Sequence, residues 1–212
     1  MIGIRPAKPS KGVKETKKAA CVAAVNKENV IKAIGQHVVL DQPGFIHEAA
    51  RLQGKVYVGP EVSIWTYAVT RSEQFSIHIG ARSNIQDFVM IHVGAASPTI
   101  VGDDCSITHH ATLHGCTIGN RCLIGINATI MDGVKIGNNC IVAGHTIVTE
   151  GSEFPDNTVI AGVPGKAVAT RDSGEANLLN AKFYSAMAET YAAGDDRLSQ
   201  EKVDQVLSAL KQ

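Results

Sequence analysis

Residues 118–148 read IGNRCLIGINATIMDGVKIGNNCIVAGHTIV, and within this stretch a branched aliphatic residue returns at every sixth position. A small or short side chain follows four residues after each of the first aliphatics, as at Cys122, Ala128 and Val134. An α-helix would repeat every three or four residues and an antiparallel meander every two, so neither explains the spacing. A hexapeptide repeat is typical of a parallel β-helix, in which three short strands make one triangular coil and the aliphatic side chain points into it.

The same period extends back through most of the chain. The inward aliphatic positions are predicted at Ile46, Leu52, Val58, Ile64, Ile79, Ile85, Ile91, Val101, Ile107, Leu113, Ile118, Ile124, Ile130, Ile136, Val142 and Val148. The small positions are predicted at Ala50, Val56, Val62, Ala68, Ser83, Val89, Ala95, Cys105, Ala111, Thr117, Cys122, Ala128, Val134, Cys140 and Thr146. Residues 70–77 and 93–100 interrupt the period, and it slips by one residue between Leu113 and Ile118. Loops project from a solenoid at such interruptions, often on the binding face.

The period divides the chain into three predicted segments. Residues 1–44 form a basic N-terminal extension without the repeat, in which residues 14–34 can form a helix. Residues 45–170 form the β-helix. Residues 171–212 change to a helical period, with a first helix that begins near Ser173 and ends at Gly194. A second helix is predicted over Ser199–Leu210 with Ser199 as its N-cap, and such helices can cover one face of the prism.

Charge and cysteine content exclude several classes of protein. Lysine plus arginine equal aspartate plus glutamate at 20 each, so the sequence predicts neither a nucleic acid nor a membrane as a partner. The apolar run after the first lysines is too short for a secretory signal, and we expect a cytoplasmic protein. The five cysteines are odd in number and lack CxxC spacing, which predicts reduced thiols.

Half of the eight histidines lie between residues 84 and 115, at His92, His109, His110 and His114. Imidazole is the commonest neutral ligand for zinc, and three protein nitrogens leave one tetrahedral position for water. His92 and His114 each follow an inward aliphatic, so both are predicted to face outward from neighbouring coils. One prism face therefore offers two ligands, and a third could come from an adjacent subunit, since flat faces pack in threefold oligomers. The alternative is that the histidines only line a solvated face, and we interpret His110 as structural.

Several motifs carry a family resemblance. Arg71 and Glu73 precede an Ile-Gly step, the sequence NIQD occupies residues 84–87, His92 follows five residues after Asp87, and HxxxxHG spans residues 109–115. On these motifs the chain, from about residue 45 to 191, resembles the gamma-class carbonic anhydrases. The resemblance implies a left-handed β-helix and a homotrimer.

The resemblance also implies a metal site at each subunit interface. The ligands would be His92 and His114 of one subunit and His109 of the next. The implied metal is Zn²⁺, although Fe²⁺ and Co²⁺ also accept three imidazoles. The reaction would be the reversible hydration of carbon dioxide to bicarbonate by a metal-bound hydroxide, because the metal lowers the pKa of its water from about 15.7 to about 7.

Further residues receive roles from the same resemblance. Gln86 would orient the metal-bound water, Arg71 and Asp87 would form a buried ion pair near the interface, and Tyr184 would approach the metal site. Glu73 replaces the usual aspartate and is one methylene longer. The loop over residues 93–100 holds no acid or histidine that could shuttle protons, so we expect low activity.

Two alternatives stay open at this point. Hexapeptide acyltransferases share the prism and an ending similar to VIAGVPGKAV at residues 159–168, and they use one histidine as a general base with acyl-CoA as donor. They need no metal, so metal removal separates the two readings. The chain could also be a catalytically weak structural or assembly homologue that keeps the fold without turnover.

Overall fold

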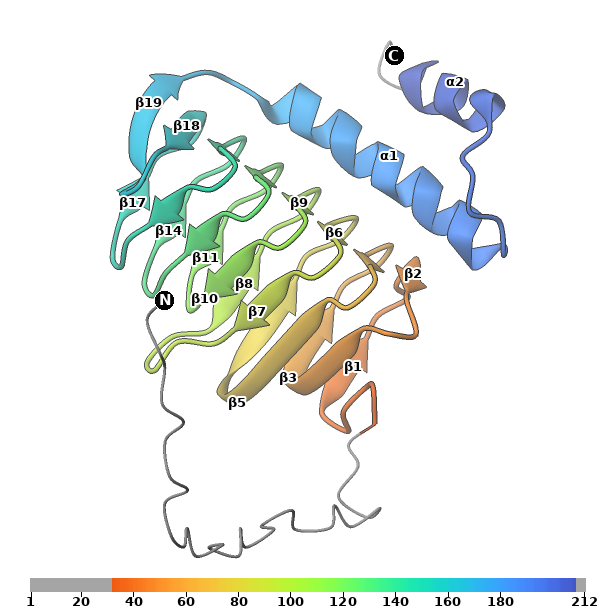
Figure 1. Cartoon of the computed structure of the whole chain (residues 1–212), viewed down its shortest axis with the longest axis horizontal. Coiled ribbons are helices and arrows are strands. Elements are labelled where there is room, and N and C mark those ends of the chain that lie inside the picture. The colour runs from red at the N-terminus through yellow and green to blue at the C-terminus, as the bar shows by residue number, and fades with distance from the viewer. Residues whose placement is uncertain (1–31, 209–212) are drawn as a thin grey trace, which may run out of the picture. The chain divides into compact units, whose positions relative to one another are not determined.

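The computed structural model describes residues 32–208, which form a parallel β-helix followed by two helices (Figure 1). From β6 to β18 each strand pairs with the strand three places further along the chain, as β6 does with β9 and β7 with β10. Each coil therefore contributes one strand to each of three faces. The predicted fold class, a left-handed parallel β-helix with C-terminal helices, is confirmed. Most of the predicted N-terminal extension, including residues 14–31 of its predicted helix, lies outside the described residues. The parallel pairing begins before residue 45, at a bridge between Ile34 and Leu52.

The first face is an eight-stranded sheet. Its strands, in spatial order, are β2 (Phe45–Ile46), β4 (Ser63–Ile64), β6 (Asn84–Ile85), β9 (Ser106–Ile107), β12 (Leu123–Ile124), β15 (Ile141–Val142), β18 (Thr158–Ala161) and β19 (Lys166–Thr170). All neighbours are parallel except β18 and β19, which pair antiparallel and close the last coil.

The second and third faces belong to one eleven-stranded sheet, because β3 (Arg51–Val58) and β5 (Val69–Ile79) continue from one face onto the other. The second face continues with β7 (Met90–His92), β10 (Thr112–His114), β13 (Thr129–Ile130) and β16 (Ile147–Val148). The third face contains β1 (Val38–Leu40), β8 (Thr99–Val101), β11 (Thr117–Ile118), β14 (Lys135–Ile136) and β17 (Glu153–Phe154).

The predicted aliphatic positions form the core. From Leu52 to Val148 every one of them is at most 3% exposed, whereas Ile46, in the first strand of its face, is only partly buried. Ile85, Ile107, Ile124 and Val142 stand in register on successive coils, so each side chain packs on its neighbours above and below. Full burial of one such side chain stabilises the fold by about 1.5–3 kcal/mol.

Two of the predicted small positions are wrong. Ala95 is exposed, because the chain leaves the coil between β7 and β8 and returns only at Thr99. Thr117 is also exposed, and Cys116 takes the interior position at 1% exposure. The five-residue step from Leu113 to Ile118 removes one residue from that turn, so the small inward position moves back by one.

The helices are α1 (Gly174–Ala192) and α2 (Gln200–Ser208). α1 lies along the first face, against β2, β4, β6 and β9, as Figure 1 shows. Asn177 fixes it there by donating from Nδ2 to the carbonyl oxygens of Arg121 at 2.8 Å and Cys140 at 3.1 Å. The backbone N–H of Lys202 donates to Ser199 Oγ at 3.3 Å, which confirms the predicted N-cap. Neither helix of the described chain is long and apolar enough to cross a membrane.

Candidate metal centre

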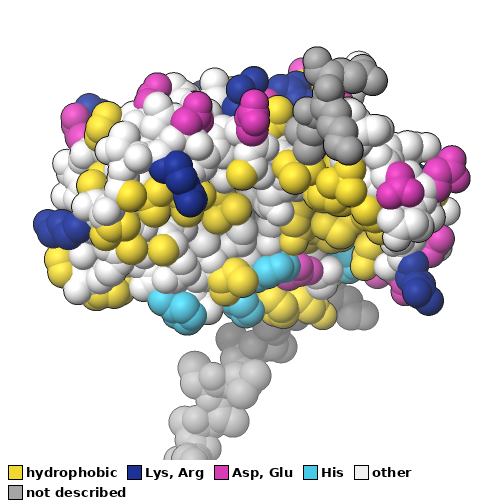
Figure 2. Space-filling view, turned by 90° about the horizontal axis from the view of Figure 1, so that it is seen from above, with side chains coloured by type: hydrophobic (Ala, Val, Ile, Leu, Met, Phe, Trp, Pro, Cys, Tyr) yellow, Lys and Arg dark blue, Asp and Glu magenta, His cyan; other side chains and the backbone are white. Residues whose placement is uncertain are grey.

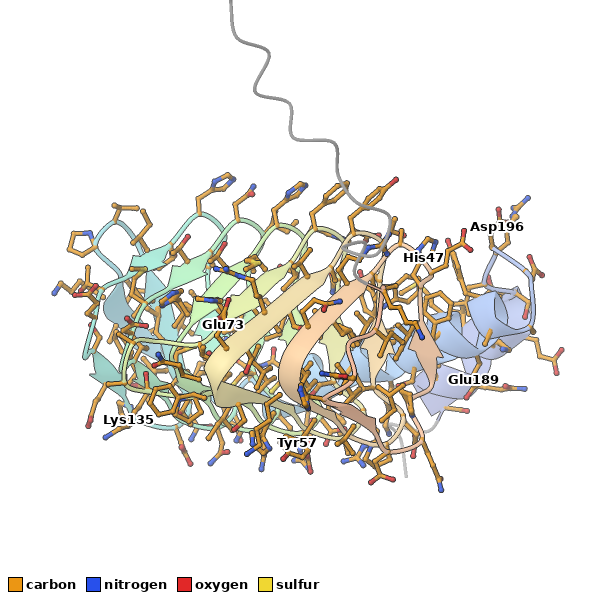
Figure 3. The ribbon with its side chains drawn as sticks, turned by 90° about the horizontal axis from the view of Figure 1, so that it is seen from below. His47, Tyr57, Glu73, Lys135, Glu189 and Asp196 are labelled. Atoms are coloured by element: carbon orange, nitrogen blue, oxygen red, sulfur yellow. The ribbon has the colours of Figure 1, made fainter. Side chains whose placement is uncertain are left out.

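One row of side chains crosses the second face on its outer side. The strand register places Arg71 of β5 beside His92 of β7, and His92 beside His114 of β10. The two histidines are 22 residues apart in sequence because the loop between β7 and β8 lengthens this coil. The prediction that they face outward from neighbouring coils is confirmed, whereas their role as ligands stays a prediction. Glu73, also from β5, lies on the outer side of the ribbon among these coils (Figure 3).

The two imidazoles face each other through one nitrogen each. His92 Nδ1 lies 3.0 Å from His114 Nε2, and the ring centroids are 4.9 Å apart with the planes inclined by 43°. Two nitrogens bound at about 2.0–2.1 Å to one tetrahedral ion lie about 3.3 Å apart. The observed spacing therefore fits two ligands of a single metal ion.

The other nitrogen of each ring contacts a carboxylate. His92 Nε2 lies 2.9 Å from Glu73 Oε2, and His114 Nδ1 lies 2.5 Å from Asp132 Oδ1. An ionised carboxylate only accepts hydrogen bonds, so each outer nitrogen carries the proton of a neutral ring. With a cation between the two rings, both inner nitrogens would be free to present their lone pairs to it. A ligating histidine typically donates its second N–H to a carboxylate in this way, so the donor set suits a divalent cation.

His109 lies in a different place, at the edge between the first and second faces, in the turn after β9. Its Nδ1 lies 3.1 Å from Asp87 Oδ2, and its ring is about two-fifths exposed. Within residues 32–208 no group of three or more His, Cys, Asp or Glu side chains is placed to hold one metal ion. A single chain therefore brings His92 and His114 together and leaves His109 apart from them.

The predicted ion pair between Arg71 and Asp87 is not formed within the described chain. Arg71 Nη1 lies 2.9 Å from Glu73 Oε1, and both side chains are more than half exposed. Asp87 instead contacts His109. Arg71 lies on the face and Asp87 in the turn after β6, so each has a nearer partner. Because Glu73 is longer than aspartate, its two oxygens reach both Arg71 and His92.

Gln86 is 2% exposed and is tied to α1 through a chain of hydrogen bonds. Its Nε2 donates to Asn84 Oδ1 at 2.9 Å, and Asn84 Nδ2 donates to Ser106 Oγ at 2.9 Å. Asn180 of α1 donates to the same hydroxyl at 2.8 Å. The sequence motif located Gln86, but the link to Ser106 and α1 depends on residues 74 positions apart and was not anticipated.

Tyr184 of α1 packs edge-on against Trp65, with ring centroids 5.6 Å apart. Burial, and then the negative charge of Asp87, raise the pKa of Tyr184 to about 12. Trp65 also packs against Tyr191 and is 6% exposed, so docking of α1 hides the single tryptophan.

Other candidate ligands are engaged elsewhere. His110 stacks on Phe88 at 4.8 Å, in a turn where its φ is +60°, which supports its structural interpretation. Figure 2 shows histidine side chains gathered along one edge of the prism, beside hydrophobic ones. Cys116 is buried inside the coil, and this burial raises the pKa of its thiol to about 12. The four cysteines within residues 32–208 are free thiols, as predicted.

Residues 115–150 match the bacterial transferase hexapeptide family (six repeats). Over 147 residues the chain is 46% identical to a probable carbonic anhydrase of Methanocaldococcus jannaschii, a match that covers 68% of this chain and 92% of that protein. It is 38% identical over 102 residues to gamma carbonic anhydrase 1, mitochondrial, of Arabidopsis thaliana, covering 45% of this chain. The chain spans only 37% of the length of that plant relative.

Two solved structures with the same fold belong to proteins named as transferases rather than carbonic anhydrases. A putative acetyltransferase of Bacillus cereus superposes with a TM-score of 0.72 at 29% identity, over 74% of this chain and 93% of that one. A hexapeptide transferase family protein of Anaplasma phagocytophilum gives a TM-score of 0.69 at 28% identity, over 73% of this chain and 92% of that one.

Proposed function

This chain belongs to the gamma carbonic anhydrase family of hexapeptide-repeat proteins, and we propose that it catalyses the reversible hydration of carbon dioxide to bicarbonate. The observation that carries the proposal is the pair His92 and His114. Their inner nitrogens are 3.0 Å apart, and their outer nitrogens face Glu73 and Asp132. Two imidazole nitrogens that converge in this way, each backed by a carboxylate on the other side of its ring, are a donor pair suited to a divalent cation.

The third ligand is His109 of a neighbouring subunit in a homotrimer. His92 and His114 supply two ligands from the second face of one subunit. His109 lies at the edge of that face, so a neighbouring subunit packed against the face can bring its own His109 to the pair. This sharing accounts for why one chain holds only two converging imidazoles. Three neutral imidazoles suit Zn²⁺, and they accept Fe²⁺ and Co²⁺ as well.

His92 and His114, with His109 of the neighbouring subunit, would hold a divalent cation, which would supply hydroxide near neutral pH because a bound metal lowers the pKa of water to about 7. The chain's own residues orient the reactants. Gln86 is held by Asn84, so its amide is fixed rather than free to rotate. Asp87 orients the His109 ring through Nδ1, and Tyr184 offers a neutral hydroxyl, whose pKa burial raises further to about 12. Arg71 keeps Glu73 directed at His92.

Proton release limits the rate in this proposal. The loop between β7 and β8 presents Ser97, whose hydroxyl donates to the carbonyl oxygen of Gly115, and it contains no carboxylate or imidazole. Protons must therefore leave through buffer or water. We expect turnover that rises with the concentration of an imidazole buffer, because added imidazole replaces the absent group.

The test is metal content per subunit on protein purified without oxygen, together with carbon dioxide hydration by the same sample. About one metal per subunit with turnover supports the proposal. Metal without turnover, even at high imidazole concentration, indicates the structural or assembly role. Protein that cannot be loaded with Zn²⁺, Fe²⁺ or Co²⁺ contradicts the proposal.

The similarity to a putative acetyltransferase favours one other candidate, acyl transfer from acyl-CoA. In that case a single histidine would act as general base and the metal would be dispensable. Binding of coenzyme A to the metal-free protein, measured by calorimetry, separates the two functions. Binding with no dependence on the histidine pair would favour acyl transfer.

A further inference from the structure

Asp132 is the carboxylate at the far end of the histidine pair, and the family motifs did not draw attention to it. It follows β13, one coil beyond His114, in the turn that begins with Met131. Its Oδ1 lies 2.5 Å from His114 Nδ1, the shortest contact in the row. About one-third of each of the two side chains is exposed, so the contact is partly shielded from water.

Two glycines leave room for this carboxylate. A Cβ on Gly115 would meet Asp132 Oδ1 at 2.4 Å, and a Cβ on Gly94 would meet it at 2.7 Å. Real Cβ atoms do not approach other atoms this closely, so any side chain at either position would displace the carboxylate. Asp132 therefore occupies a fitted slot beside His114 rather than an open surface.

The slot exists because of the register slip. The step from Leu113 to Ile118 is five residues, whereas the paired step from Ile130 to Ile136 on the next coil is six. Gly133 donates its N–H to Gly115, so the two glycines stack across the coils. Asp132 is then the extra residue of the longer turn, and its side chain rises into the space above the shortened one.

The contact geometry excludes direct metal binding by Asp132 in this arrangement. The two nitrogens of an imidazole lie on opposite sides of the ring, and Asp132 contacts Nδ1 while Nε2 faces His92. The carboxylate accepts the Nδ1 proton, which leaves the lone pair on Nε2. No other hydrogen bond of the Asp132 side chain is present within residues 32–208, so the side chain does not serve to hold its own turn.

We propose that Asp132 is a positioning residue that fixes the tautomer and orientation of His114 so that its Nε2 binds the metal. The proposal rests on the metal site described above and adds a residue to it. Removal of such an outer partner typically lowers metal affinity 10–100-fold. Glu73 does the same at the other end of the pair, but it is more exposed and also holds Arg71.

Glu150 provides a matched control. It lies 18 residues after Asp132, in the equivalent turn of the next coil, and precedes Gly151 as Asp132 precedes Gly133. Gly151 donates its N–H to the Asp132 carbonyl in the same ladder. The Glu150 carboxylate is exposed and has no histidine beside it. Glu150→Ala therefore removes one negative charge from this edge of the prism without changing His92, His114 or their partners.

The experiment measures Zn²⁺ affinity by chelator competition for the full-length wild type, Asp132→Ala, Asp132→Asn and Glu150→Ala. Circular dichroism and size-exclusion chromatography check that each variant is folded and assembled. We expect Asp132→Ala to bind about 10–100-fold more weakly and Glu150→Ala to match the wild type. Asp132→Asn should lose less than Asp132→Ala, because its amide oxygen can still accept the Nδ1 proton. Equal affinity of the wild type and Asp132→Ala overturns the proposal.

Long-range ¹H–¹⁵N NMR of the metal-free protein supplies a readout that needs no metal and no activity. The wild type should carry the His114 proton on Nδ1, and Asp132→Ala should lose that preference while Asp132→Asn keeps it. A proton on Nε2 in the wild type overturns the proposal. Failure of the wild type to bind Zn²⁺ overturns the proposed function itself, and with it the role of Asp132 in affinity, whatever the tautomer.

Discussion

The first and second faces of the prism are built from the same hexapeptide, yet only one of them is completed by its own chain. On the first face α1 covers β2, β4, β6 and β9, and Asn177 satisfies two backbone carbonyls of the coils. On the second face a row from Arg71 to Asp132 stands partly exposed, with one nitrogen of His92 facing one nitrogen of His114.

The comparison separates the residues that stabilise this fold from those available for chemistry. Inward aliphatic side chains form the core behind both faces, so the outward positions can differ between the faces without loss of the fold. On the first face they serve to dock a helix. On the second they form a polar row that we propose is completed by a neighbouring subunit and a metal ion.

The largest effect is expected from substitution of the proposed metal ligands, because these residues serve only the second face and the metal. His92→Ala and His109→Ala should each abolish metal binding at every site, since all subunits carry the change. Mixing the two unfolded variants and refolding them together should restore about a quarter of the sites, because a random neighbour pair is complementary that often. Metal content of the mixed trimers, measured by mass spectrometry of inorganic elements, gives the answer. No recovery would show that ligands do not cross the interface.

The next largest effect concerns the interior that both faces share. Ile124→Ala removes a fully buried side chain and should lower the free energy of unfolding by about 2–5 kcal/mol per subunit. Ile100→Ala is the matched control, because Ile100 on the third face is 36% exposed, and it should cost less than half as much. Urea unfolding followed by circular dichroism measures both. Similar losses would indicate that Ile100 is buried in the assembly.

A smaller effect is expected when the helix on the first face loses its anchor. Asn177→Ala leaves the carbonyl oxygens of Arg121 and Cys140 without their donor, at a cost of about 1–3 kcal/mol. Hydrogen exchange should increase along residues 174–192 and stay unchanged in β7 and β10. Faster exchange throughout the prism would contradict the view that α1 is an attachment to a self-sufficient core.

The smallest effect tests whether the two faces communicate. Ser106→Ala removes the hydroxyl that both Asn84 and Asn180 contact, so Gln86 loses its link to α1. We expect kcat/KM to fall by an amount equivalent to about 0.5–1.5 kcal/mol while metal content stays full. Hydration kinetics and metal analysis on the same preparation measure the two quantities. Loss of metal would place Ser106 in the binding of the ion instead.

The period of six predicted the fold because the constraint is local and repeated. A side chain at each sixth position must fill a narrow prism, so Leu52, Ile91 and Ile130 could be assigned without any knowledge of tertiary contacts. The same register argument placed His92 beside His114. The argument failed at Ala95 and Thr117. A loop interrupts the repeat at Ala95 and a shortened turn precedes Thr117, and the period alone does not show which residue then faces inward.

The rest of the site depends on contacts that no period encodes. Glu73 reaches His92 from the irregular part of β5, and Asp132 reaches His114 because one turn is a residue shorter than the next. Asn180 meets Ser106 across 74 residues. These partners were not predicted, since each depends on how two coils or a coil and a helix are offset. Motif resemblance supplied Gln86 and Tyr184, whereas within the chain Arg71 contacts Glu73 and Asp87 contacts His109, so the predicted pair of Arg71 with Asp87 stays a prediction for the interface.

The antiparallel strand β19 has a consequence for how large this protein's assemblies can grow. A solenoid ends in open edges, and an unprotected edge strand invites pairing with another chain. Here β19 folds back onto β18, and all five of its residues are exposed. A second copy that tried to continue the parallel coil would meet a strand running the wrong way. The hairpin therefore disfavours end-to-end fibres and leaves lateral packing as the open route to oligomers.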